Sequence, residues 1–437
     1  MTNREMVDRS LAAVWHPCTQ MKSHERFPLV PVARAEGVWL HDFEGRRYLD
    51  AVSSWWVNLF GHAHPAIDAA VRDQVGKLEH VMIAGFTHEP VVELAERLSR
   101  IAPGRLGHAF FASDGASATE IALKMAFHYW ANRGKAAKRR FVSLAGGYHG
   151  ETVGALAVTD VALFRDAYAP LVRESIVAPF PQRREDDGGF GGVAGAMEAA
   201  DALAKLLEER HPEIAALIVE PLVQGASGMR MHHPEYLRRA RELCTRFDVL
   251  LIADEIMTGF GRTGTMFACE QGPIAPDLLC LSKGISGGYL PLSCVLSADA
   301  IYAAFYDDDP RKGFLHSHSY TGNALACRAA CAVLDLFERE DVIAANAAKA
   351  ARFTQLAAPL AKHHGVRNFR HLGMIWAFEA ATGDASFALR AFALALERGV
   401  LVRPIGNTVY FMPPYVIDEE QFSMLVTATL EIMDKLT

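Results

Sequence analysis

The middle of the sequence alternates short apolar runs with helical segments, and this alternation constrains the fold more than any other feature. The apolar runs occupy residues 108–113, 139–146, 214–221, 249–255 and 277–284. Segments with helical spacing, such as residues 118–134 and 234–247, separate them. Strands that alternate with helices form a largely parallel sheet whose faces are both covered. The sequence therefore predicts an α/β fold.

Polar side chains follow two of these runs, where open α/β sheets bind their ligands. Lys283 is followed by a glycine-rich stretch, which lets the backbone approach a flat ligand. A buried lysine with a lowered pKa can form a Schiff base; the alternative is a surface lysine at a strand end. Asp254 could keep a pyridine nitrogen protonated, or it could be a helix cap. Together the two residues predict pyridoxal phosphate as cofactor.

The segment around Gly115 and Ala116 reads as a strand that runs into the start of a helix. A helix N-terminus built from small residues offers N–H groups and a positive dipole end to a phosphate. The alternative is a plain capping box, with Ser113 or Ser117 as the cap and Glu120 as its partner. The two interpretations are compatible.

Composition excludes several other classes. Of the 437 residues, 51% are hydrophobic and 22% charged, with a net charge of -7, which is typical of a globular protein and disfavours a nucleic-acid or anionic-membrane partner. No apolar run approaches the ~18 residues of a membrane span, and the N-terminus lacks the apolar core of a signal peptide. Seven cysteines without a CxxC motif favour a reducing cytoplasm. We expect a cytoplasmic enzyme without a metal site.

The long segment 249–288, which joins Asp254 to Lys283, resembles the signature of the class III aminotransferases, enzymes of the pyridoxal-phosphate transferase fold type I. Three further segments, 148–152, 218–225 and 316–327, carry the resemblance over most of the chain. Four others resemble one branch of the class, which aminates 8-amino-7-oxononanoate in biotin biosynthesis. They are WHPCTQM at 15–21, SSWW at 53–56, GASGMRMHHPE at 225–235 and VRPIGNTVYFMPPY at 402–415.

The resemblance implies roles for individual residues on the cofactor side. Lys283 would hold the cofactor covalently and then move the proton between substrate and cofactor. Asp254 would pair with the pyridine nitrogen, and Tyr148 would stack on the ring and face the substrate. Gly115 and Ala116 would donate backbone N–H groups to the phosphate. Ser319 would reach the phosphate site of the other subunit in a homodimer.

On the substrate side, the resemblance implies a pocket walled by Trp55 and Trp56, with Arg403 binding the carboxylate of the keto substrate. In many class III members an arginine binds the carboxylate of glutamate, and an acidic residue controls whether that arginine is available. Here Tyr410 and Ala226 stand at those two positions, and arginine is the side chain best shaped for carboxylate binding. The absence of the arginine and of the acid argues against an enzyme that uses glutamate as its amino donor.

The sequence alone does not decide which molecule is the amino donor. S-adenosyl-L-methionine is the common donor of the branch, but Cys18 occupies a position that often holds a substrate-contacting tyrosine, and lysine is the alternative donor. The alternatives in function are an ω-amine or polyamine:pyruvate aminotransferase and a binding module without turnover. We expect a large cofactor domain over residues 61–325 and a smaller α/β domain formed by residues 1–60 and 326–437.

Overall fold

A computed structural model describes residues 1–182 and 192–437. The chain forms two compact units, one of Ala66–Ala347 and one of Met1–Pro65 with Ala348–Thr437. The predicted boundaries, 60/61 and 325/326, differ from these. The second boundary differs more, since it falls after Ala347 and not after residue 325. The reason is that helix α11 (Ala324–Glu340) packs against α4 (Glu89–Ile101) within the larger unit. Among the described residues, no helix is long and apolar enough to cross a membrane.

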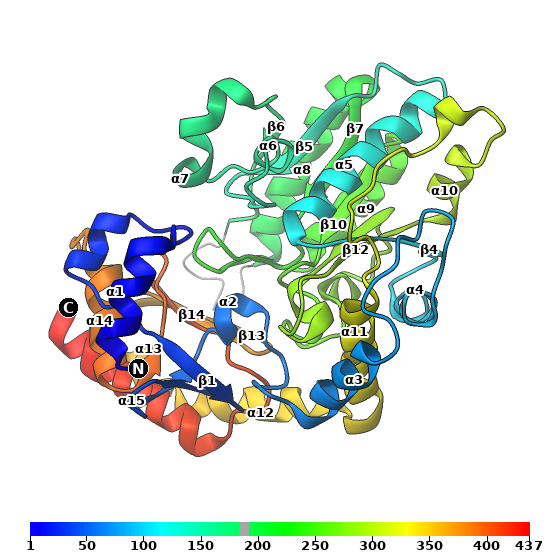
Figure 1. Ribbon diagram of the computed structural model, residues 1–437. Coiled ribbons are helices and arrows are strands. Elements are labelled where there is room, and N and C mark those ends of the chain that lie inside the picture. Colours follow the sequence, from blue (N-terminus) through cyan, green and yellow to red (C-terminus); the bar gives the residue numbers. More distant parts are fainter. Residues whose placement is uncertain (183–191) are drawn as a thin grey trace. The chain divides into compact units, whose positions relative to one another are not determined.

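The larger unit is built on a seven-stranded sheet (Figure 1). In spatial order its strands are β4 (His108–Ala112), β12 (Ser293–Ser297), β11 (Leu278–Leu281), β10 (Leu250–Asp254), β7 (Ile214–Val219), β5 (Arg140–Leu144) and β6 (Ile176–Ala178). Strand β12 runs antiparallel to both neighbours, and the other pairs are parallel. The predicted α/β fold with a mostly parallel sheet is confirmed.

Helices cover this sheet. Helix α5 (Gly115–Asn132) packs across β7, β10, β11 and β12, whereas α8 (Val193–Arg210) and α9 (Glu235–Arg246) pack against each other. All residues of β7, β10 and β11 are buried, because a sheet covered on both faces has no solvated side. The remaining helices of the unit include α3 (Pro65–Val75), α6 (Val153–Leu156), α7 (Ala162–Arg165) and α10 (Asp299–Phe305). A hairpin, β8 (Val223–Gln224) with β9 (Arg230–Met231), follows β7.

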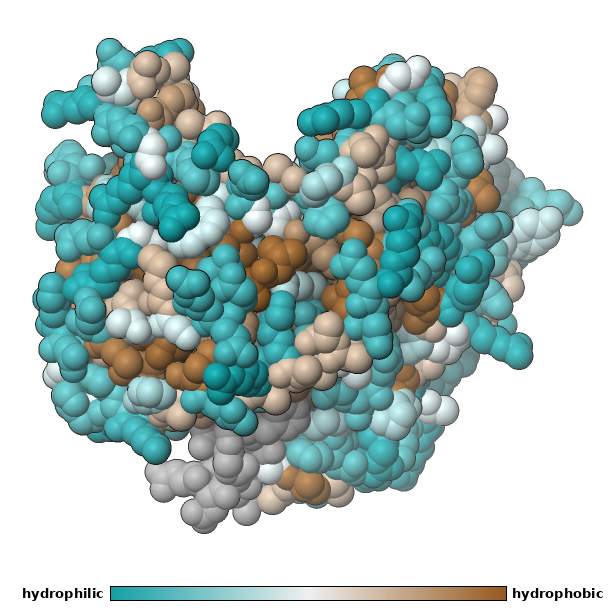
Figure 2. Space-filling model, turned by 90° about the horizontal axis from the view of Figure 1, so that it is seen from below, coloured by the Kyte–Doolittle hydropathy of each residue, from teal (hydrophilic) through white to brown (hydrophobic). Residues whose placement is uncertain are grey.

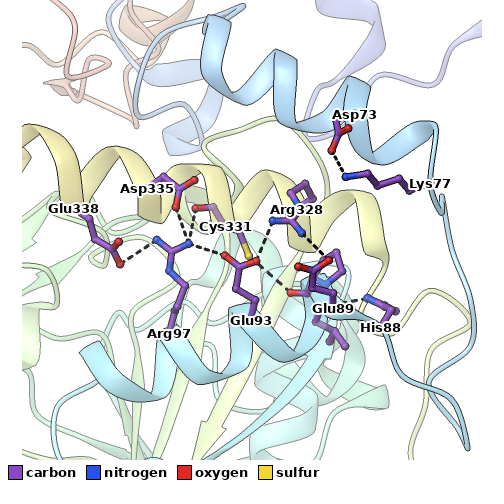
Figure 3. A network of polar contacts seen from close by, with 12 residues as sticks. Asp73, Lys77, His88, Glu89, Glu93, Arg97, Arg328, Cys331, Asp335 and Glu338 are labelled. Carbon is purple, nitrogen blue, oxygen red and sulfur yellow. Dashed lines mark hydrogen bonds and ion pairs between the residues drawn. The ribbon is translucent and has the colours of Figure 1, made fainter.

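An ion network ties α4 to α11 (Figure 3). The buried guanidinium of Arg97 on α4 lies 2.8 Å from the carboxylate of Asp335 and 3.0 Å from that of Glu338, both on α11. Glu93 on α4 lies 3.0 Å from Arg97 and 3.0 Å from Arg328 of α11. Because Arg97 is buried, its acidic partners are needed to offset its desolvation. The network holds the two helices in register.

The smaller unit joins both ends of the chain. Strands β1 (Val32–Glu36), β2 (Trp39–Asp42) and β3 (Arg47–Asp50) form an antiparallel sheet, and β15 (Val400–Leu401) adds to β3 in parallel. A second antiparallel sheet contains β13 (Val366–Leu372), β14 (Ile375–Ala380) and β16 (Thr408–Phe411). The helices are α1 (Asn3–Ala13), α2 (Ser53–Trp56), α13 (Ala358–Lys362), α14 (Phe387–Glu397) and α15 (Glu419–Leu436), and α12 (Val342–Leu356) crosses the unit boundary.

Candidate active site

Asp254 and Lys283 come from neighbouring parallel strands of the larger unit. Asp254 ends β10 and is in register with Cys280 of β11, and Lys283 follows β11 by two residues. Asp254 is only 4% exposed. Its Oδ2 accepts a hydrogen bond from His149 Nδ1 at 2.7 Å, and its Oδ1 accepts one from the Ile256 N–H at 3.1 Å. The carboxylate is therefore buried, oriented and next to the lysine.

Lys283 is desolvated and conformationally constrained. Burial lowers the pKa of its amine to about 8, against the opposing effect of Asp254 and Glu220. The residue as a whole is of intermediate exposure, and its amine is poorly hydrated. The backbone at Lys283 has a φ of 48°, a left-handed conformation that costs a non-glycine residue about 1–3 kcal/mol and that clusters at functional sites. An amine of this kind is suited to carbonyl chemistry near neutral pH.

The first turn of α5 approaches this pair. The cap is Asp114, whose carboxylate accepts from the Ser117 N–H at 2.9 Å and from the Ser117 hydroxyl at 2.8 Å. The alternative capping box is therefore wrong, and Glu120 instead accepts from Thr152 and Gly154. The N–H groups of Gly115 and Ala116 precede the capped one and belong to the turn that has no intrahelical acceptors. They are placed to receive an anion.

Tyr148 lies on a loop packed tightly against that helix start. A Cβ on Gly150, whose φ is 122°, would come within 2.6 Å of the Ala116 Cβ, so only glycine permits this approach. The Tyr148 ring packs with Phe164 at a centroid distance of 5.3 Å, and its hydroxyl donates to Glu151 at 2.9 Å. The loop thereby brings an aromatic ring, a helix N-terminus, a buried carboxylate and an amine to one end of the sheet.

Two further polar residues of this site are absent from the sequence-based prediction. His149 is 2% exposed and holds Asp254. Glu220, also buried, accepts from the N–H groups of Tyr148 and Gly225, and burial raises its pKa to about 7. The signals were His149 within the 148–152 motif and Glu220 directly after the apolar run of β7. The sequence does not show that His149 meets Asp254, 105 residues away, or that Glu220 meets Tyr148, 72 residues away.

The predicted substrate residues of the smaller unit form two contacts. Trp56 Nε1 donates to the Tyr410 hydroxyl at 3.1 Å, and both side chains are buried. The Arg403 guanidinium lies over the Trp55 ring, 4.8 Å from its centroid. Trp55 itself is 42% exposed and Arg403 is also exposed. An exposed cation on an aromatic face can bind a carboxylate that ends an apolar chain.

The two tryptophans lie on a left-handed turn. Ser53, Ser54, Trp55 and Trp56 have φ values of 50°, 47°, 75° and 72°. Left-handed backbone costs L-residues about 1–2 kcal/mol each, so tertiary contacts must hold this turn. The two indoles still point to different surroundings, one buried and one exposed.

The remaining predicted residues, Ser319 and Cys18, lie on other segments of their units. Ser319 is exposed, and its carbonyl accepts from His80 at 2.8 Å. Cys18 is exposed, with a φ of 49°, between α1 and the turn at Met21–Glu25. His316 and His318 have their Nε2 atoms 3.1 Å apart, but residues 1–182 and 192–437 contain no cluster of three or more metal-ligating side chains.

Comparisons with known proteins identify the class. The sequence profile of the family described as aminotransferase class-III matches residues 20–433. The chain therefore belongs to this family, whose members are pyridoxal-phosphate-dependent transaminases, and the predicted class and cofactor are confirmed. The site fits that cofactor, since it combines a buried carboxylate, a desolvated amine and a helix start that a Cβ at Gly150 would obstruct.

Individual relatives narrow the comparison. Adenosylmethionine-8-amino-7-oxononanoate aminotransferase of Helicobacter pylori is 44% identical over 433 residues, covering 98% of this chain and 97% of that protein. The crystal structure of the Methanocaldococcus jannaschii protein of the same name superimposes with a TM-score of 0.93 at 34% identity, covering 99% of both chains. An amine transaminase from an uncultivated Pseudomonas species, crystallised with pyridoxal phosphate, gives a TM-score of 0.89 at 32% identity, covering 97% of this chain and 99% of the other.

Proposed function

We propose that this enzyme transfers an amino group to the ketone of 8-amino-7-oxononanoate to give 7,8-diaminononanoate, in biotin biosynthesis, with S-adenosyl-L-methionine as amino donor. The observation that carries the proposal is the desolvated Lys283 amine beside the buried Asp254 carboxylate, in a chain whose relatives, at 34–44% identity over nearly their full length, bear that activity in their names. L-lysine is the second candidate donor, because Cys18 lacks the phenol of a tyrosine.

The residues of the larger unit would divide the cofactor chemistry. Bound pyridoxal phosphate supplies an electron sink for the carbon that loses its proton. Lys283 Nζ takes that proton and returns it, which its lowered pKa of about 8 favours near neutral pH. Asp254, held by His149, keeps a proton on the pyridine nitrogen. Tyr148 covers the ring, and the N–H groups of Gly115 and Ala116 bind the phosphate.

The smaller unit would supply substrate specificity. The keto substrate is a carboxylate at the end of an apolar chain, and the tryptophans and Arg403 offer matching surfaces. Tyr410 carries no positive charge, and Ala226 carries no carboxylate. The arginine and the acid that bind glutamate in other class III enzymes are therefore missing. We accordingly assign Ala66–Ala347 as the cofactor domain and the remaining unit as the domain that selects the substrate.

A homodimer with shared active sites completes the proposal. Hydrophobic residues are visible on the surface among hydrophilic ones (Figure 2). Several large apolar side chains close to Ser319 in sequence or space are more than half exposed; they are Met82, Phe86, Leu315 and Tyr320. Exposed apolar patches of this kind mark protein interfaces. A second copy would cover them and place its Ser319 at the phosphate. All seven cysteines are free, which fits a reducing cytoplasm.

The decisive experiment is a half-reaction assay on the purified pyridoxal-phosphate form. S-adenosyl-L-methionine, L-lysine and simple amines are offered separately, and the loss of the cofactor's visible band is followed. The aminated enzyme is then mixed with 8-amino-7-oxononanoate or pyruvate. We expect reaction with S-adenosyl-L-methionine and then with the oxononanoate. Reaction only with diamines and pyruvate would instead identify an ω-amine aminotransferase, and a cofactor that no donor converts would identify a binding module.

A further inference from the structure

A buried carboxylate–imidazole pair supports the turn that carries Trp55 and Trp56. Asp50, at the end of β3, is fully buried. Its Oδ1 accepts from the Ser54 N–H at 3.0 Å and the Val52 N–H at 3.3 Å, and its Oδ2 accepts from the Ser54 hydroxyl at 2.7 Å. His62 Nε2 lies 3.1 Å from the same Oδ2. One carboxylate thus receives four hydrogen bonds, two of them from Ser54 of the turn and one from Val52, which directly precedes it.

The turn depends on such contacts because its own backbone is unfavourable. Four consecutive residues, Ser53 to Trp56, have positive φ and none is glycine. Left-handed runs of L-residues do not persist on their own, since each Cβ crowds the following carbonyl. Besides Asp50, the ends of the turn are held by the Ser53 hydroxyl, which donates to the Met412 carbonyl at 2.7 Å, and by Trp56, which donates to the Val52 carbonyl and to the Tyr410 hydroxyl. Asp50 is therefore the main group that fixes the middle of the turn.

His62 is fixed by a different part of the unit. Its backbone N–H donates to the Gly37 carbonyl at 2.7 Å, and its carbonyl accepts from the Gly37 N–H at 2.9 Å, beside the β1–β2 turn. Its side chain is 18% exposed, whereas that of Asp50 is 0% exposed. The imidazole thus links the carboxylate to the rigid hairpin and partly covers it from solvent.

The turn carries two of the residues of the smaller unit that are proposed to contact the substrate, Trp55 and Trp56. Trp56 reaches Tyr410, and Trp55 lies under Arg403. A turn that relaxed to ordinary right-handed backbone would redirect both indoles and remove the aromatic face from the arginine. The aromatic face beneath Arg403 therefore depends on a carboxylate that does not contact the arginine.

We propose that Asp50 and His62, here called the Asp50–His62 clamp, are positioning residues that set the affinity for the keto substrate by holding the left-handed turn. The proposal rests on the proposed function, because it takes Trp55, Trp56 and Arg403 as substrate-binding residues. The clamp acts on substrate binding and leaves proton transfer at Lys283 unaffected.

The first experiment compares KM and kcat for 8-amino-7-oxononanoate in four variants, Asp50→Ala, Asp50→Asn, His62→Ala and His62→Gln. We expect the two alanine variants to raise KM about tenfold, equivalent to about 1.4 kcal/mol, with kcat within about threefold of the parent. The Asn and Gln variants keep hydrogen-bonding atoms in place and are expected to stay within about threefold of the parent KM.

The matched control is Asp42→Ala. Asp42 is also a buried carboxylate of this unit, and it accepts from the N–H groups of Glu44 and Arg46 and from the Tyr48 hydroxyl, none of which belongs to the turn. We expect it to lower thermal stability without changing KM. If Asp50→Ala changed KM no more than Asp42→Ala does, the clamp would be refuted. Should Asp50→Ala fail to fold, His62→Ala carries the same comparison.

A second measurement needs no substrate and so separates the clamp from the proposed function. The six tryptophans are labelled with 5-fluorotryptophan, and the resonances of Trp55 and Trp56 are assigned by replacing each with Phe. We expect His62→Ala and Asp50→Ala to shift these two resonances and Asp42→Ala to leave them in place. Unshifted resonances would overturn the clamp even if the parent turned over the oxononanoate; failure of that turnover alone would refute only the proposed function.

Discussion

The stability of the cofactor-free enzyme should rise with pH because of one residue, Lys283. Burial lowers the pKa of its amine from 10.5 to about 8. Below pH 8 both the folded and the unfolded chain carry the charge, and the folded chain bears the whole desolvation cost. Between pH 8 and 10.5 the unfolded chain binds the extra proton, so the free energy of unfolding increases with pH. Above pH 10.5 the cost is gone.

The size of this effect follows from the two pKa values. Each pH unit between them corresponds to about 1.4 kcal/mol. Allowing for the intermediate exposure of the residue, the cost at pH 7 is about 2–3 kcal/mol. The perturbation is Lys283→Met, which keeps the length of the side chain and removes the charge. Cofactor-free Lys283→Met should therefore be more stable than the parent by about 2–3 kcal/mol at pH 7, and by less than about 1 kcal/mol at pH 10.

Two assays check the prediction. Urea unfolding of both proteins from pH 7 to 10 gives the difference in unfolding free energy. Stopped-flow absorbance gives the rate at which the cofactor-free parent captures pyridoxal phosphate. At pH 8 about half of the Lys283 amines should be neutral, against less than about 1% for an ordinary lysine, so this rate should level off above pH 8. A capture rate that still rose tenfold per pH unit near pH 10, or a stability difference independent of pH, would refute the reasoning.

Further predictions concern other groups of the two units. Asp254→Asn should slow the half-reaction with the amino donor by about 10²–10³-fold in a single-turnover assay, because an amide cannot hold the pyridine proton; a change below about threefold would contradict it. Arg403→Ala should raise KM for the oxononanoate about tenfold with Arg403→Lys intermediate, and an unchanged KM would exclude the role. Arg97→Met should lower the unfolding free energy by about 2 kcal/mol. This is less than for a fully buried ion pair, because the carboxylates that contact Arg97 are partly exposed. Denaturant unfolding measures the change, and an unchanged unfolding free energy would show that the α4–α11 network is not stabilising.

Much of the larger unit could be predicted from the sequence because its signals are local. Apolar runs of four to six residues become strands, and polar residues directly after them lie at the carboxyl edge of a parallel sheet. Asp254 and Lys283 could thus be placed together across 29 positions. His149 and Glu220 could not, since a buried polar residue is recognised only when its hydrogen-bond partners are known, and Asp254 and Tyr148 lie far from them in the sequence.

The sequence by itself determined the α/β class, the cofactor chemistry and the identity of the charged groups that carry it. The tertiary structure decided how the substrate-facing residues are displayed. The resemblance implies that Trp55 and Trp56 both line the substrate pocket, but not the backbone that carries them, and Ser53–Trp56 form a left-handed turn. Local preference opposes that conformation. It exists because Asp50, itself bonded to His62, accepts hydrogen bonds from Ser54, and because the Met412 carbonyl, 359 residues from Ser53, accepts one from the Ser53 hydroxyl.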